Sequence, residues 1–162
     1  MTDQTTDQGT GHPHAVSERI GPGSVSVTRV APRRYEGLNE RGATVQIGGA
    51  ELEGEHFTPG ELLKLALAGC VGLSVDRVTA RRLGDDYAMT VWAHGRSDGE
   101  SNRYQQIAEE VLVDLSMLEP DDRAKLVGIM ARAIEKGCTV GRSVEGAIDV
   151  DTEIDGTRVE AH

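Results

Sequence analysis

The most reactive side chains in this sequence belong to its two cysteines, Cys70 and Cys138. A thiol acts as a nucleophile only in its thiolate form, and burial disfavours that form, so a reactive cysteine needs a cation nearby. The two cysteines are too far apart for a zinc motif, and the five histidines are scattered. The pair therefore predicts a redox-active dithiol or two small, inert residues of the core, while a structural disulfide is disfavoured in a reducing compartment.

Cys70 lies in the most hydrophobic stretch of the chain, residues 58–83, which read TPGELLKLALAGCVGLSVDRVTARRL. Thr58 is a suitable N-cap, Pro59 suits the first helical position, and Gly84 is suited to end the helix. Up to Val75 this stretch is apolar on nearly every side, which is typical of a buried helix. We therefore expect a long, buried central helix that carries Cys70.

The remainder of the chain predicts strands and one further helix. Period-two alternation marks the strands, and an apolar stripe of helical period marks the second helix. The expected elements are a strand at 24–30, an interruption at 32–36, a turn at 39–42, a return strand at 43–47, strands at 87–97 and 104–117, a helix from Pro120 to Gly137, and a strand at 146–154. Hairpins separated by helices favour the α+β class.

The length and composition predict one domain at 24–155, with a polar, disordered tail at 1–23 and a short tail at 156–162. The net charge of −10 argues against a nucleic-acid partner, because phosphates require a basic surface. No apolar run free of charge is long enough to cross a membrane, and the N-terminus lacks a secretory pattern. We therefore expect a cytoplasmic protein without a membrane partner.

Several charged residues could supply the cation and the orienting carboxylate that a reactive Cys70 needs. The candidates are Arg29, Arg33, Arg34 and Arg41 in the first hairpin, Glu51, Glu53 and Glu55 in the following loop, and Glu61 at the helix start. Cys138 directly follows the end of the second helix, where the helix dipole disfavours a thiolate. That position suits a resolving cysteine better than a primary nucleophile.

Two segments together resemble the OsmC/Ohr family of thiol-dependent peroxidases, the osmotically induced and organic hydroperoxide resistance proteins. They are PGELLKLALAGC at 59–70 and EKGCTVGRSVEGAIDV at 135–150. The resemblance extends from Ser24 to about Asp151 in the same order of elements. It implies an OsmC-like fold in which antiparallel sheets wrap around central helices, built as an intertwined homodimer with two active sites at the subunit interface.

The resemblance also implies roles for individual residues. Cys70 would attack an organic hydroperoxide, Cys138 would resolve the resulting sulfenic acid as a disulfide, and Arg33 would activate the thiolate, with Arg34 as the alternative. A dithiol reductant, either a lipoylated or a thioredoxin-like protein, would reopen the disulfide. The resemblance thus predicts an antioxidant enzyme of the oxidative stress response, with no cofactor and no metal.

The sequence departs from the family pattern at the helix start. The organic-hydroperoxide branch has a glutamate ten positions before its first cysteine to anchor the arginine, whereas this chain has Gly60. Glu61 either takes over that role or only caps the helix. A second hypothesis is therefore an OsmC-like protein that binds a small apolar ligand without peroxide turnover, and a third leaves both cysteines inert.

Overall fold

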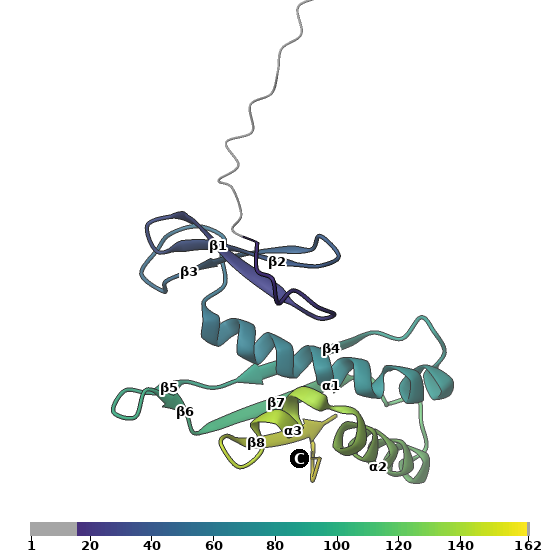
Figure 1. Cartoon of the computed structure of the whole chain (residues 1–162). Coiled ribbons are helices and arrows are strands. Elements are labelled where there is room, and N and C mark those ends of the chain that lie inside the picture. The colour runs from purple at the N-terminus through teal and green to yellow at the C-terminus, as the bar shows by residue number, and fades with distance from the viewer. Residues whose placement is uncertain (1–15, 162) are drawn as a thin grey trace, which may run out of the picture. The chain divides into compact units, whose positions relative to one another are not determined.

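The computed structural model describes residues 16–161, which divide into two compact units between Pro59 and Gly60 (Figure 1). The first unit contains β1 (Val25–Ala31), β2 (Arg34–Asn39) and β3 (Thr44–Gly48). The second contains nearly all of α1 (Pro59–Leu83), then β4 (Met89–His94), β5 (Ser97–Asp98), β6 (Arg103–Tyr104), β7 (Gln106–Val113), α2 (Pro120–Gly137), α3 (Thr139–Val144), β8 (Asp149–Ile154) and β9 (Thr157–Val159). Of the tail expected at 1–23, residues 1–15 lie outside the described residues, and 16–23 contain only turns and irregular chain. These elements confirm the predicted α+β class.

The first unit is an antiparallel meander in the order β1-β2-β3. Pro32 and Arg33 form a two-residue loop, because Ala31 pairs with Arg34 across it. Proline suits such a loop, since it presets φ and donates no hydrogen bond. The prediction that the strand pattern stays interrupted as far as Glu36 is therefore wrong, and β2 begins at Arg34.

Helix α1 begins and ends where the sequence predicts. Glu61 lies in its first turn, where a negative charge favours the helix dipole, and Arg81 and Arg82 lie in its last turn. Gly84 follows with φ of 94°, a left-handed conformation that glycine adopts without strain. Within residues 16–161, no helix is both long and apolar enough to span a membrane.

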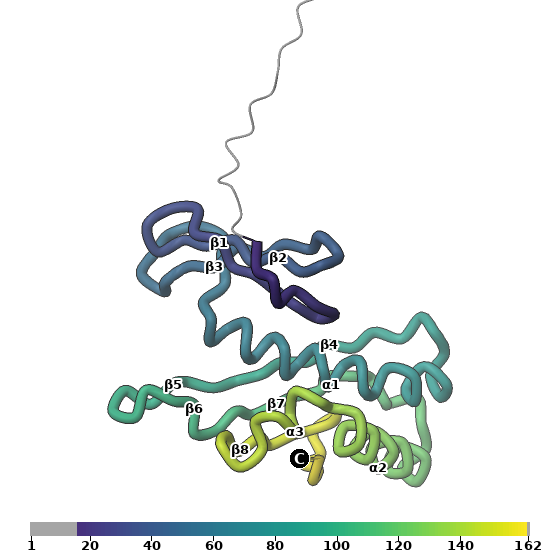
Figure 2. The backbone as a smooth tube through the Cα atoms, viewed as in Figure 1, coloured from purple at the N-terminus to yellow at the C-terminus, as the bar shows by residue number. Residues whose placement is uncertain are grey.

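The second unit has a four-stranded sheet in the order β4-β7-β8-β9, with β5 and β6 as a small hairpin. β4 pairs antiparallel with β7, as predicted, but β7 pairs parallel with β8. This differs from the antiparallel sheets that the sequence predicts. Parallel neighbours require a crossover, and Figure 2 shows the chain leaving β7, passing through α2 and α3 and returning as β8.

The core of the second unit forms between one face of this sheet and the helices. Its members include Val71 and Val75 of α1, Val111 and Val113 of β7, Leu126, Met130 and Ile134 of α2, and Ile154 of β8. Cys138 belongs to the same cluster, and Cys70 packs against it. Burial of these side chains positions the two cysteines in the unit.

Only one face of α1 is buried, although the composition predicts burial on nearly every side. Leu67, Val71 and Val75 are buried, whereas Leu65 is exposed and Leu73 is 83% exposed. A single sheet covers one side of a helix, so the second apolar side requires a further layer. Within the second unit, α1 therefore presents an apolar stripe, including Leu65 and Leu73, that the sheet does not cover.

The C-terminal segment is ordered where the sequence predicts a tail at 156–162. Asp155 and Gly156 both have positive φ, and they reverse the chain between β8 and β9. β9 then pairs with β8, and Ala161 is buried in the core. The edge of the sheet thus contains one more strand than the sequence predicts.

Two neighbouring side chains of α2 that differ in burial provide a test of this core. Met130→Ala removes a fully buried side chain, so we expect it to lower the free energy of unfolding by about 2–5 kcal/mol. Ile129 is 41% exposed on the same helix, and Ile129→Ala should cost less than about 1 kcal/mol. Denaturant titration of both variants checks the assignment, which equal losses would contradict.

Candidate functional site

The structure brings the two cysteines together in the second unit. Cys70 lies near the middle of α1 and is partly exposed, whereas Cys138 follows α2 directly and is fully buried. The helices approach closely here, because a Cβ added at Gly137 would lie 3.2 Å from Ser74 Oγ. Ser74 is one turn beyond Cys70 on α1, and Cys138 directly follows Gly137. The contact between Ser74 and Gly137 therefore places Cys138 beside Cys70.

Cys138 occupies a junction between two helices. It is the C-cap of α2 and the N-cap of α3, and the Gly141 N–H donates a hydrogen bond of 3.3 Å to its Sγ. Burial raises the pKa of the Cys138 thiol to about 11; the Gly141 N–H opposes this rise, while the side chains of Cys70 and Glu109 add to it. Cys138 is therefore a neutral thiol near pH 7, as expected of a resolving cysteine rather than a primary nucleophile.

A buried carboxyl group, which the sequence analysis missed, lies near the Cys138 thiol. Glu109 on β7 is only 1% exposed, and its Oε2 accepts a hydrogen bond of 3.1 Å from the Thr152 hydroxyl on β8. The signal was present in the sequence, because Glu109 interrupts the inward-facing series that includes Ile107 and Val111. A charged residue on the core face of a strand indicates a special role.

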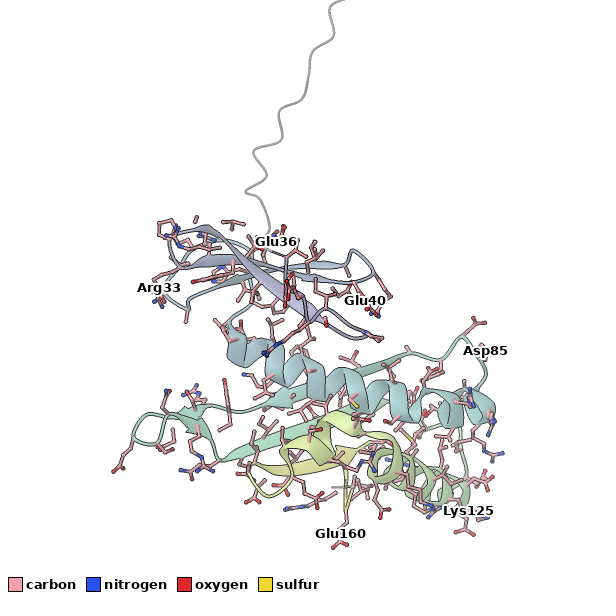
Figure 3. All side chains as sticks on the ribbon, in the orientation of Figure 1. Arg33, Glu36, Glu40, Asp85, Lys125 and Glu160 are labelled. Atoms are coloured by element: carbon pink, nitrogen blue, oxygen red, sulfur yellow. The ribbon has the colours of Figure 1, made fainter. Side chains whose placement is uncertain are left out.

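Arg33, the predicted activating residue, lies in the first unit in the loop between β1 and β2, where Figure 3 labels it. Its Nε donates to Oε1 of Glu51, and the two side chains form an exposed ion pair. This hydrogen bond raises the pKa of Arg33 and lowers that of Glu51. Arg34, the alternative, donates instead to the backbone oxygen of Glu53 at 2.6 Å. Arg33 is thus the arginine with a carboxylate partner in its own unit.

Glu61 lies in the first turn of α1, nine residues before Cys70. At 1.5 Å per residue and 3.6 residues per turn, it is about 13 Å away along the axis and about half a turn around it. Glu61 and Cys70 therefore point to opposite sides of the helix. Any role of Glu61 toward the thiol has to act through another residue.

The neighbouring position explains the departure at Gly60. A Cβ placed at Gly60 would lie 2.0 Å from the hydroxyl oxygen of Tyr104. The same tyrosine ring lies under Lys64, whose Nζ is 5.8 Å from the ring centroid and donates to the Gly95 carbonyl oxygen at 3.1 Å. Tyr104 thus occupies the space that a side chain at position 60 would need, so a glutamate does not fit there without displacing it.

The second unit also has an apolar hollow away from the cysteines. It has a volume of about 390 Å³ and lies between α1 and α2, with Val78, Leu126 and Ile129 as its apolar wall and Arg81 and Arg82 at its rim. Across residues 16–161, no three or more histidine, cysteine or acidic side chains gather as metal ligands.

The family of the chain follows from comparison with known proteins. The family model described as OsmC-like protein matches residues 52–153, which include α1, both cysteines and most of β8. The chain therefore belongs to the OsmC-like family. Proteins of Mycobacterium tuberculosis and Mycobacterium bovis, both described as uncharacterized, are each 44% identical over 128 residues, covering 79% of this chain and 93% of theirs.

Solved structures confirm the OsmC-like fold. The organic hydroperoxide resistance protein OhrB of Bacillus subtilis superposes with a TM-score of 0.56 at 15% identity, covering 82% of this chain and 96% of its own. An OsmC-like protein of unknown function from Vibrio cholerae superposes with a TM-score of 0.60 at 18% identity, covering 83% and 99%. At these identities the likeness establishes the fold.

The contact between Gly60 and Tyr104 can be tested by a double-mutant cycle. In the Tyr104→Ala background, Gly60→Ala should stabilise the protein by up to about 1 kcal/mol, because alanine favours a helix. With Tyr104 present, the clash should remove or reverse that gain. Gly69→Ala on the same helix is the control, since no atom lies within 4 Å of its added Cβ. Denaturant titration that found no coupling between positions 60 and 104 would contradict the contact.

Proposed function

We propose that this chain is a cysteine-based peroxidase that reduces organic hydroperoxides as part of an oxidative stress response in the cytoplasm. The observation that supports this best is the placement of Cys70 and Cys138, the two cysteines of the chain, side by side in one core with unequal exposure. A partly exposed thiol can meet a substrate. A buried thiol beside it can then close a disulfide without solvent access.

The chemistry proceeds in three balanced steps. The Cys70 thiolate attacks the distal oxygen of the hydroperoxide, the O–O bond breaks, and the leaving alkoxide takes up a proton to become an alcohol. Cys138 then attacks the resulting sulfenic acid, so that an S–S bond forms, the S–O bond breaks and water leaves. A dithiol reductant, a lipoylated or thioredoxin-like protein, returns both cysteines to thiols and is itself oxidised to a disulfide.

Arg33 is the residue that we propose as the activating cation, with Glu51 as a carboxylate that holds it within the first unit. A guanidinium would stabilise the Cys70 thiolate and could donate to a peroxide oxygen. Glu61 is the second carboxylate proposed to orient the arginine. Its place on the far side of α1 from Cys70 supports an indirect role rather than contact with the sulfur.

We further propose that the protein functions as an intertwined homodimer. The uncovered apolar stripe of α1, which includes Leu65 and Leu73, and the exposed Val25 and Val27 of β1 are surfaces that a second copy of the chain would bury. Dimer formation would thus supply the second apolar layer that α1 lacks within the second unit.

The comparisons support a peroxidase-related role in general terms. The chain belongs to the OsmC-like family, and structural neighbours that share its fold include proteins named for organic hydroperoxide resistance, from Bacillus subtilis and Legionella pneumophila. The organic hydroperoxide substrate and the dithiol reductant are implied by the resemblance to this family, and for this chain both are proposals.

A second candidate function is binding of a small apolar ligand without peroxide turnover. Tyr104 fills the position where the organic-hydroperoxide branch carries its carboxylate, which favours this alternative. The apolar hollow between α1 and α2 is of a size that suits a small ligand. In that case the cysteines would be structural residues of the core.

The peroxidase proposal is tested by turnover of cumene hydroperoxide with dihydrolipoamide as the reductant. We expect Cys70→Ser to abolish turnover, because no other residue forms the sulfenic acid. Cys138→Ser should slow turnover or change its dependence on the reductant, because it leaves that acid unresolved. Arg33→Lys should lower kcat/KM more than Arg29→Lys, the matched control on β1.

The wild-type result separates the two candidate functions. No consumption of hydroperoxide by folded wild-type protein would reject the peroxidase proposal for this substrate class and leave ligand binding as the better account. Turnover that persists in Cys70→Ser would reject the role of Cys70 itself.

A further inference from the structure

The buried Glu109 has a position that the proposed function does not use. Glu109 pairs in register with Ala93 on β4 and with Thr152 on β8, and neither of these neighbours carries a charge. It lies on the core face of β7 between Ile107 and Val111, and Val111 belongs to the same buried cluster as Cys138. The Glu109 side chain also contributes to the raised pKa of the Cys138 thiol. The Thr152 hydroxyl donates to Oε2, which fixes the orientation of the carboxyl group.

Both directions of the proposed thiol chemistry require a proton to move at Cys138. Cys138 is fully buried and neutral near pH 7, so it does not become a nucleophile without giving up a proton. When the disulfide is reduced, an external dithiol reaches only the partly exposed Cys70. The dithiol therefore attacks Cys70 Sγ, and Cys138 is the leaving group as the S–S bond breaks. A thiol whose pKa is raised leaves slowly unless it is protonated as the S–S bond breaks.

We infer that Glu109 is the internal proton acceptor for Cys138 when the disulfide forms and the proton donor to Cys138 when the disulfide is reduced. This inference rests on the proposed pairing of Cys70 with Cys138. It gives a chemical reason for a carboxyl group on the core face of β7, where only apolar residues would otherwise be favoured.

The proton balance in disulfide formation is as follows. The Cys138 Sγ–H proton passes to the Glu109 carboxylate, directly or through one water, as Sγ attacks the Cys70 sulfenic sulfur. The S–S bond forms, the S–O bond of Cys70 breaks, and the departing hydroxide takes a proton from Glu109 and leaves as water. In reduction, a thiol of the dithiol ionises and its proton reaches Glu109 through solvent. The resulting thiolate attacks Cys70 Sγ, the S–S bond breaks, and Cys138 leaves with the proton from Glu109.

Glu109→Gln tests the inference, because glutamine keeps the shape and can keep the hydrogen bond to Thr152 but carries no exchangeable acid. Glu110→Gln is the matched control, since Glu110 is the next residue of β7, faces the opposite side and lies 3.6 Å from His94. Glu109→Asp retains the acid, and thermal unfolding confirms that each variant is folded.

Two rates are measured in rapid-quench experiments on the full chain. The first is closure of the disulfide after one equivalent of cumene hydroperoxide. The second is reduction by dithiothreitol of a disulfide formed with diamide, which needs no peroxide chemistry. At pH 7 we expect both rates to fall about tenfold or more in Glu109→Gln and to change less than about twofold in Glu110→Gln.

The pH profile separates a proton carrier from a merely structural residue. In Glu109→Gln the closure rate should rise about tenfold per pH unit between 7 and 9, because only hydroxide or solvent then removes the Cys138 proton, while the wild type and Glu109→Asp rise less steeply. Wild-type rates and a wild-type profile in Glu109→Gln would overturn the inference.

The two arms keep this inference distinct from the peroxidase proposal. If wild-type protein forms no sulfenic acid with hydroperoxide, the peroxidase proposal fails, and the diamide and dithiothreitol arm still decides the role of Glu109. If wild-type protein turns over hydroperoxide and Glu109→Gln behaves identically in both arms, only the role of Glu109 is rejected. Failure of diamide to join Cys70 to Cys138 would overturn the inference as well, because the pairing on which it rests would be absent.

Discussion

The close packing of α1 against the C-terminal end of α2 is the contact on which the rest of the site depends. Gly137 has no side chain, and a Cβ there would lie 3.2 Å from Ser74 Oγ, so any larger residue would make this contact tighter. One turn back along α1 is Cys70, and one residue on from Gly137 is Cys138. A dithiol from distant parts of the sequence is thus assembled by a helix–helix contact rather than by a local motif.

The parallel pairing of β7 with β8 positions the buried carboxyl group of Glu109. The crossover through α2 and α3 returns the chain beside β7, which places Thr152 next to Glu109 in the register of the sheet. Helix α2 of this crossover ends at Cys138, which packs in the core on the same face of the sheet as Glu109. The topology therefore brings two thiols and a carboxyl group into one core, and their unequal burial is the basis of the different roles that we propose for them.

Local signals in the sequence predicted what depends on local physics. Thr58, Pro59 and Gly84 marked the ends of α1, and Pro120 marked the start of α2. The parallel register of β8, the strand β9 and the uncovered face of α1 depend on contacts between distant segments, which one sequence read in isolation does not reveal. Glu109 was missed although its alternation with Ile107 and Val111 placed it on the inward face of the strand. Its nearly complete burial depends in addition on the segments that pack over that face.

The central claim is that Cys70 and Cys138 form one reactive pair within a chain, and peptide mapping after oxidation tests it most directly. Reduced protein receives one equivalent of cumene hydroperoxide, and the products are mapped by mass spectrometry while the cumyl alcohol is measured. The account predicts an intrachain disulfide between Cys70 and Cys138 together with a matching yield of alcohol. Free cysteines beside unconsumed peroxide, or a disulfide that joins Cys70 of two chains, would contradict it.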